Sequence, residues 1–134
     1  MSGETNLDLL LGNLSAILHP EVYVFSTLPD HAVPASVSAR MIFKEEEGTT
    51  LILRKEEAEQ HHLAFEFPCR MITLDIHSSL EAVGFIARIA TELARQGMGV
   101  NPVSGFYHDH LFVPEGREDE ALAVLTKLTG DKNA

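Results

Sequence analysis

The order of apolar and polar residues changes twice between residues 71 and 113. From Met71 to His77 every second residue is apolar, and this period of two predicts a strand with one buried face. From Ser78 on, apolar residues recur at helical spacing and form one stripe: Ala82, Ile86, Ile89, Ala90 and Leu93. Ser78 and Glu81 have the spacing of a capping box, which predicts Ser78 as the N-cap of this helix. Further strands are predicted at Val100–Gly105 and His110–Val113, so the unit is strand, helix, strand, strand.

The remaining chain shows the same two periods. Leucines spaced by three and four residues predict a first helix, Leu7–Leu18, that ends before Pro20. The other predicted elements are strands at Val22–Thr27, Val37–Lys44, Thr49–Leu53 and Leu63–Phe67, and helices at Lys55–His62 and Glu115–Leu128. A tight acidic turn, Glu45–Gly48, is expected to join the second and third of these strands. We expect Pro68–Arg70 to interrupt the chain between two strands.

These elements predict an α+β fold. The second half has the order βαββα, which is one strand short of a ferredoxin-like unit. The first half, or a partner chain, must supply the missing strand. We therefore expect two interlocked ferredoxin-like lobes of the βαββαβ type, residues 1–66 and 67–134, with antiparallel sheets and helices on one face.

Composition narrows the possible partners and location. The formal charge of −10 disfavours nucleic acid and anionic membrane surfaces as partners, because both need a basic surface. No apolar run is long enough to span a bilayer, and the first residues lack the basic region of a signal peptide. Cys69 is the single cysteine, which excludes an internal disulfide and fits a reducing cytosol. We expect a cytoplasmic protein.

The sequence contains no motif that predicts a catalytic site or a metal site. His108 and His110 flank Asp109, and alternate side chains of a strand point to opposite faces, so this spacing does not fix three ligands. Cys69 has no base beside it in the sequence that would make it a nucleophile. Phosphate-binding loops, dinucleotide fingerprints and serine-hydrolase elbows are absent from the sequence. We expect no catalytic residues, no metal and no cofactor.

The segment HSSLEAVGF … HDHLFVP resembles the ACT domain, the small ligand-binding module of amino-acid-regulated enzymes. The matching features are a strand before a helix with Val83-Gly84-Phe85, a helix end at Ala-Arg-Gln-Gly, a strand that carries Asn101–Ser104, and a strand that ends in His-Leu-Phe-Val. More narrowly, it is similar to small bacterial proteins with two ACT-like halves and no assigned activity. Paired ACT modules also occur in aspartate kinases and in cytosolic arginine sensors of animals. The usual Pro-Gly of the strand-helix corner is replaced here by Val83-Gly84.

The resemblance implies a ligand site at the corner between the strand and the helix. Its candidate residues are Asp75, Ser78, Ser79, Val83, Gly84, Phe85, Asn101 and Val103. Amides at the helix N-terminus favour an anion such as a carboxylate, and Asp75 and Asn101 could bind an ammonium group. A second interpretation is structural: Gly84 lets helix and sheet pack closely, and Ser78 is only a cap.

The function expected from these observations is a regulatory or sensor module, without catalytic activity, that binds a small molecule, an amino acid. The alternative is an interaction or assembly domain without a ligand, and a metal-dependent hydrolase that uses the histidines ranks third. We also expect a homodimer, because the second half lacks a strand and Pro102 belongs on an edge strand.

Overall fold

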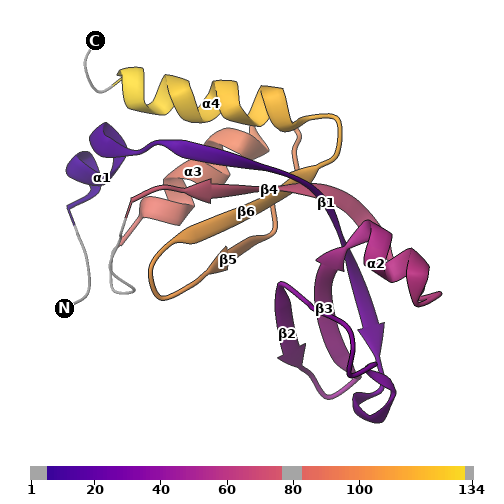
Figure 1. Ribbon diagram of the computed structural model, residues 1–134. Helices are drawn as coiled ribbons and strands as arrows, with labels where there is room; N and C mark the ends of the chain where they lie inside the picture. Colours follow the sequence, from indigo (N-terminus) through magenta and orange to yellow (C-terminus); the bar gives the residue numbers. More distant parts are fainter. Residues whose placement is uncertain (1–5, 77–82, 132–134) are drawn as a thin grey trace. The chain divides into compact units, whose positions relative to one another are not determined.

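The computed structural model describes residues 6–76 and 83–131, and it is an α+β structure (Figure 1). The elements are α1 (Leu7–Asn13), β1 (Ala16–Leu28), a 3-10 turn (Asp30–Ala32), β2 (Met41–Lys44), β3 (Thr49–Arg54), α2 (Lys55–Gln60), β4 (Glu66–Leu74), α3 (Phe85–Ala94), β5 (Pro102–Ser104), β6 (Asp109–Pro114) and α4 (Glu118–Asp131). Within the described ranges, no helix has the length and apolar character needed to cross a membrane.

Contacts divide the chain into two compact units. Residues 1–19 and 70–134 form one, called here the terminal unit, and residues 20–69 form the other, the middle unit. β1 and β4 each contribute residues to both. The predicted lobes, residues 1–66 and 67–134, divide the chain by sequence alone, and that division stays a prediction.

The start of the chain supplies the strand that the second half lacks. In the terminal unit the strand order is β1-β4-β6-β5. The amide of Asp75, just after β4, donates to the carbonyl of Ser15, just before β1, at 2.7 Å. Because this pairing lies within one chain, a partner chain is not needed to complete the sheet of the terminal unit.

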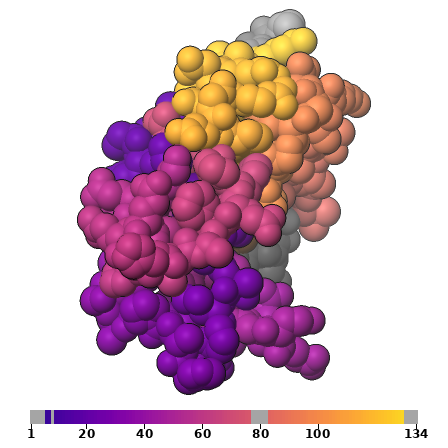
Figure 2. Space-filling model, turned by 90° about the vertical axis from the view of Figure 1, so that its right-hand side faces the viewer, coloured from indigo at the N-terminus to yellow at the C-terminus, as the bar shows by residue number. Residues whose placement is uncertain are grey.

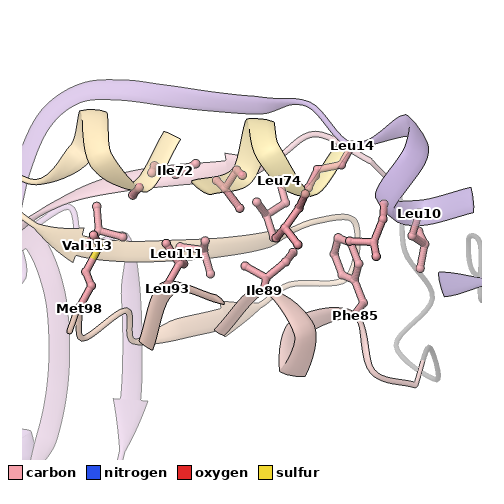
Figure 3. Packing of buried hydrophobic residues seen from close by; sticks show 14 residues of the cluster. Leu10, Leu14, Ile72, Leu74, Phe85, Ile89, Leu93, Met98, Leu111 and Val113 are labelled. Carbon is pink, nitrogen blue, oxygen red and sulfur yellow. The ribbon is translucent and has the colours of Figure 1, made fainter. Parts of the chain in front are cut away.

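The core of the terminal unit lies between one face of its sheet and three helices (Figure 3). The strand residues are Ile72, Leu74, Leu111 and Val113, and the helix residues include Leu10, Phe85, Ile89, Leu93, Ala121, Leu125 and Leu128; Leu14, directly after α1, joins them. Each large side chain buried here stabilises the fold by about 1.5–3 kcal/mol relative to an exposed position. The outer surface of α4 faces solvent (Figure 2), with exposed Thr126 and Lys127. In the stripe predicted for α3, Ile89 and Leu93 are buried and Ile86 and Ala90 are half-buried, while Ala82 lies outside the described residues.

The middle unit is built on the antiparallel order β2-β3-β1. Val24, Leu51 and Leu53 form its core with Ala58 of α2. The predicted turn Glu45–Gly48 is confirmed: Glu45 and Gly48 exchange backbone hydrogen bonds at 2.9 and 3.3 Å. Gly48 has φ +154°, and an added Cβ would lie 3.0 Å from the Leu28 carbonyl oxygen, so the turn requires glycine.

Some predicted boundaries are wrong. α1 ends at Asn13, earlier than predicted. The chain is extended from Ala16 on, and β1 runs through His19-Pro20 because the residue before a proline also favours the extended conformation of a strand. The predicted break at Pro68–Arg70 is also wrong, since β4 runs unbroken through it; the irregularity lies at Phe67, with φ +57°.

The predicted half-buried strand at residues 71–77 is wrong in its exposed face. Met71 and Thr73 are 2% and 6% exposed, so the residues of β4 are buried on both faces there. The Thr73 hydroxyl explains how a polar residue is accommodated: its oxygen lies 2.7 Å from His19 Nε2 and 2.9 Å from His110 Nδ1. A hydroxyl has one hydrogen, so at least one of the two imidazoles donates.

Candidate functional site

The predicted corner lies where α3 begins in the terminal unit. The N-cap of α3 is Gly84, with φ +89° and ψ −7°, and it has no side chain with which to cap the helix. The first turn contains no acidic residue. The prediction that the helix begins near Ser78 is therefore wrong, and Ser78 and Ser79 lie outside the described residues. Gly84 itself therefore supplies no side-chain acceptor to the first amides of α3, and such a helix end favours an anion.

Backbone conformation explains why glycine stands at position 84. Among the residues that the structure describes, an added Cβ would meet only Leu7 Cδ2, at 3.7 Å, which is an ordinary van der Waals contact. Space therefore does not exclude a side chain, and close packing of helix on sheet is not the reason for the glycine. The positive φ is, because residues with a Cβ rarely adopt it.

The residues around Gly84 differ in their exposure to solvent. Val83 is 85% exposed, so its side chain is available to a ligand. Phe85 is 2% exposed and belongs to the core beneath the corner. Asp75 is exposed directly after β4. The carbonyl of the next residue, Ile76, lies 3.3 Å from His108 Nδ1, so the β5–β6 hairpin lies beside this end of β4.

Asn101 lies toward the other end of the β5–β6 pair. Val103 pairs with His110 and Pro102 with Leu111, which puts Asn101 level with Phe112. His108, whose ring contacts the carbonyl of Ile76 directly after Asp75, lies at the opposite end of the β5–β6 pair, next to the hairpin turn. The strand register therefore places Asn101 and Asp75 toward opposite ends of the β5–β6 pair. The corner consists of Asp75, Val83 and the first turn of α3.

His108, His110 and Cys69 make contacts within the part of the chain that the structure describes. The rings of His108 and His110 lie 6.5 Å apart at right angles, and His110 bonds with Thr73. No cluster of three or more His, Cys, Asp or Glu side chains in residues 6–76 and 83–131 is arranged to hold a metal ion. Cys69 is fully buried, and its thiol donates to the Tyr23 carbonyl at 3.3 Å.

The structure also contains a hollow that the sequence did not indicate. It lies in the middle unit, has a volume of about 330 Å³, and is lined by Glu21, Tyr23, Ser38, Ala39, Arg40 and Arg54. Two of the ten basic residues of the chain border it. The two arginines converge through strand pairing. In the sequence, Arg40 lies within one predicted strand and Arg54 directly follows another, so neither position indicates a shared site.

Comparison with known proteins agrees with the fold. Family models described as ACT domain match residues 2–70 and residues 66–127. The chain belongs to the ACT domain family, whose members are typically regulatory modules that bind small molecules. No curated protein matches the chain.

Solved structures give the same picture. The chain is similar to a Vibrio cholerae protein of unknown function, described as a possible transport protein, with 38% identity, TM-score 0.81, and coverage of 92% of this chain and 95% of that one. A protein of Agrobacterium tumefaciens matches with 16% identity, TM-score 0.74, and coverage of 87% and 89%. The regulatory subunit of aspartate kinase from Thermus thermophilus matches with 9% identity, TM-score 0.65, and coverage of 88% and 97%. The last two likenesses, at such low identity, show the fold alone.

Proposed function

We propose that this protein is a cytoplasmic regulatory or sensor module that binds an amino acid and has no catalytic activity of its own. The observation that carries the proposal is the match of two ACT domain models, at residues 2–70 and 66–127. The formal charge of −10 supports the further proposal that nucleic acid and membranes are not its partners.

The corner of the terminal unit supports a carboxylate ligand. Gly84 leaves the N-terminus of α3 without a side-chain cap, and Val83 is exposed beside it. Helix N-termini favour anions because their first amides have no partner within the helix. Asp75, exposed at the end of β4, supplies a carboxylate for the ammonium group of the ligand.

A thermal-shift screen of the twenty amino acids tests this proposal. A ligand that binds only the native state at about 100 times its Kd adds about 2.7 kcal/mol to the free energy of unfolding. The variant Val83→Glu places a negative charge at the corner and should suppress the shift. Gln96→Glu adds the same charge at an exposed site beyond the end of α3 and should respond like the wild type.

Two results would contradict the corner site. One is that no amino acid raises the melting temperature of the wild type. The other is that Val83→Glu keeps the full response. A ligand-free assembly domain, the second candidate, would give the first result together with a stable dimer.

The exposed edge strand β2 supports the proposed homodimer. β2 is the last strand on its side of the middle unit, and Ile42 and Phe43 are 57% and 62% exposed. Antiparallel pairing of two copies of β2 would put Ile42 of one chain opposite Phe43 of the other, which is a favourable apolar pair. Such pairing makes β2 a better candidate for the dimer contact than the missing strand.

Light scattering tests the homodimer. Wild-type protein should show twice the chain mass of 14.8 kDa, and Phe43→Lys should be monomeric. Phe106→Lys, at an exposed position on the β5–β6 hairpin, serves as the control and should stay dimeric. A wild-type mass of one chain at every concentration would rule the dimer out.

A further inference from the structure

The hollow of the middle unit is bordered by charged side chains from three separate segments. Tyr23 of β1 is the cross-strand partner of Arg54 of β3, so their side chains lie on the same face of the sheet. Glu21 precedes Tyr23 by two residues on the same strand and therefore shares that face. Arg40 comes from the segment before β2, where its amide donates to the Ile52 carbonyl at 2.7 Å.

Arg40 is held in a defined place by Tyr23. Its Nη2 and Nε donate to the Tyr23 hydroxyl oxygen at 2.8 and 3.3 Å, and its guanidinium carbon lies 5.6 Å from the centre of the ring. Tyr23 is 2% exposed, so the group that anchors Arg40 is itself fixed by packing. A guanidinium has five N–H donors, and these two bonds use two of them. The remaining donors of Arg40 are in reach of a ligand, because the residue is exposed.

Arg54 is equally accessible. Its side chain is 44% exposed and lies 3.9 Å from the carboxylate of Glu56, whose side chain is 73% exposed. An ion pair this long and this exposed contributes little and does not prevent Arg54 from binding another carboxylate.

A buried carboxylate of α2 holds the segment of residues 38–40 that lines the hollow. The amide of Ser38 donates to Glu57 Oε2 at 2.7 Å, and Glu57 is 5% exposed. This bond ties the segment that carries Ser38 and Arg40 to α2. The position of the Arg40 guanidinium is therefore set before any ligand arrives, which lowers the entropic cost of binding.

The charged groups that border the hollow define the ligand. Each guanidinium presents a planar fork that matches one carboxylate, and Glu21 offers a carboxylate to a cation. We propose that the hollow binds a small acidic amino acid, with its two carboxylates on Arg40 and Arg54 and its ammonium on Glu21. The ligand charge of −1 balances the sum of +1 from the three side chains. This site is separate from the corner at Gly84, and the inference does not depend on the function proposed for the corner.

Titration calorimetry on the full chain tests the inference, with L-aspartate, L-glutamate, succinate and inorganic phosphate as probes. Arg54→Gln should weaken binding of the acidic amino acids about tenfold or more, since a charge-assisted hydrogen-bonding partner is lost. Arg40→Gln should do the same. Lys44→Gln removes one positive charge from an exposed site at the other end of β2 and should bind like the wild type.

Glu21→Gln separates the ammonium contact from the carboxylate contacts. It should weaken binding of L-aspartate or L-glutamate and leave succinate, which has no ammonium group, unweakened. The inference is overturned if the wild type binds neither amino acid at up to about 10 mM, or if Lys44→Gln weakens binding as much as Arg54→Gln. Succinate and phosphate binding as tightly as the amino acids would overturn the assignment of an amino-bearing ligand. A failure of Val83→Glu to change this binding leaves the inference standing, because that residue belongs to the corner.

Discussion

Replacing Gly84 with alanine should destabilise the protein through the backbone alone. The methyl group has room among the described residues, where its one near neighbour would be Leu7 Cδ2 at 3.7 Å. The backbone, however, must keep φ near +89° for the chain to enter α3. The mutation therefore isolates the conformational cost of a Cβ at positive φ from any cost of overpacking.

The expected size of the effect follows from two opposing terms. A residue with a Cβ in this region costs about 1–2 kcal/mol. Alanine also has fewer unfolded conformations than glycine, which raises the free energy of unfolding by about 0.4–1 kcal/mol. The net loss for Gly84→Ala is therefore about 1 kcal/mol, or a fall of about 4 °C in melting temperature for a chain of this length.

Two further variants make the test specific. Gly99→Ala lies outside the set of glycines with positive φ and meets no atom within 4 Å, so it should be neutral or slightly stabilising. Gly84→Asn should lose less than Gly84→Ala, because asparagine tolerates the left-handed region better. Urea unfolding of the three variants, extrapolated to water, measures the differences. If Gly84→Ala is as stable as Gly99→Ala, backbone strain is not the reason for glycine at position 84.

Three other results are expected. Arg70→Ala should lower the free energy of unfolding, measured in urea, by about 2–3 kcal/mol. Arg70 is mostly buried and donates to Glu118 at 2.9 Å and to the His19 carbonyl at 2.8 and 3.0 Å. The control is Arg95→Ala at an exposed site, which should lower it by about 0.5 kcal/mol or less. The fully buried Cys69 thiol should react with a thiol reagent only as fast as the protein unfolds, and rapid reaction in native buffer would show that it is accessible. Dialysis against EDTA should leave the melting temperature unchanged, since the described residues present no metal cluster; a clear fall would reveal a bound ion.

Much of the fold follows from periodicity. The alternation from residue 71 and the stripe that follows correctly predict a strand and then a helix, although β4 ends at Leu74 and α3 begins only at Phe85. The acidic turn before Gly48 correctly predicts the hairpin of β2 and β3. The overlong first helix shows the limit of this reasoning. Leu14 and Leu18 continue the helical spacing of the leucines, yet Gly12-Asn13 marks the stop, and these are residues that commonly end helices.

The candidate site was less accessible from the sequence. Gly84 could be picked out as the glycine of a corner, but its left-handed backbone moves the start of α3 to Phe85, and a capping-box pattern seven residues earlier conceals this. The separation of Asp75 from Asn101 depends on strand register, which local pattern does not determine. The same holds for Arg40 and Arg54, which come together only through the pairing of β1, β2 and β3.

The inclusion of the first nineteen residues in the terminal unit has a consequence for synthesis on the ribosome. α1 and the start of β1 pack with segments that begin at residue 70, so α1 is synthesised well before its packing partners. The middle unit is contiguous in sequence and has shorter loops to close, which favours earlier formation. Pulsed hydrogen exchange during refolding should then protect amides of β3 before those of β6. Until residues 70–131 emerge, the leucines of α1 are exposed on the nascent chain, where they are open to chaperones and to aggregation.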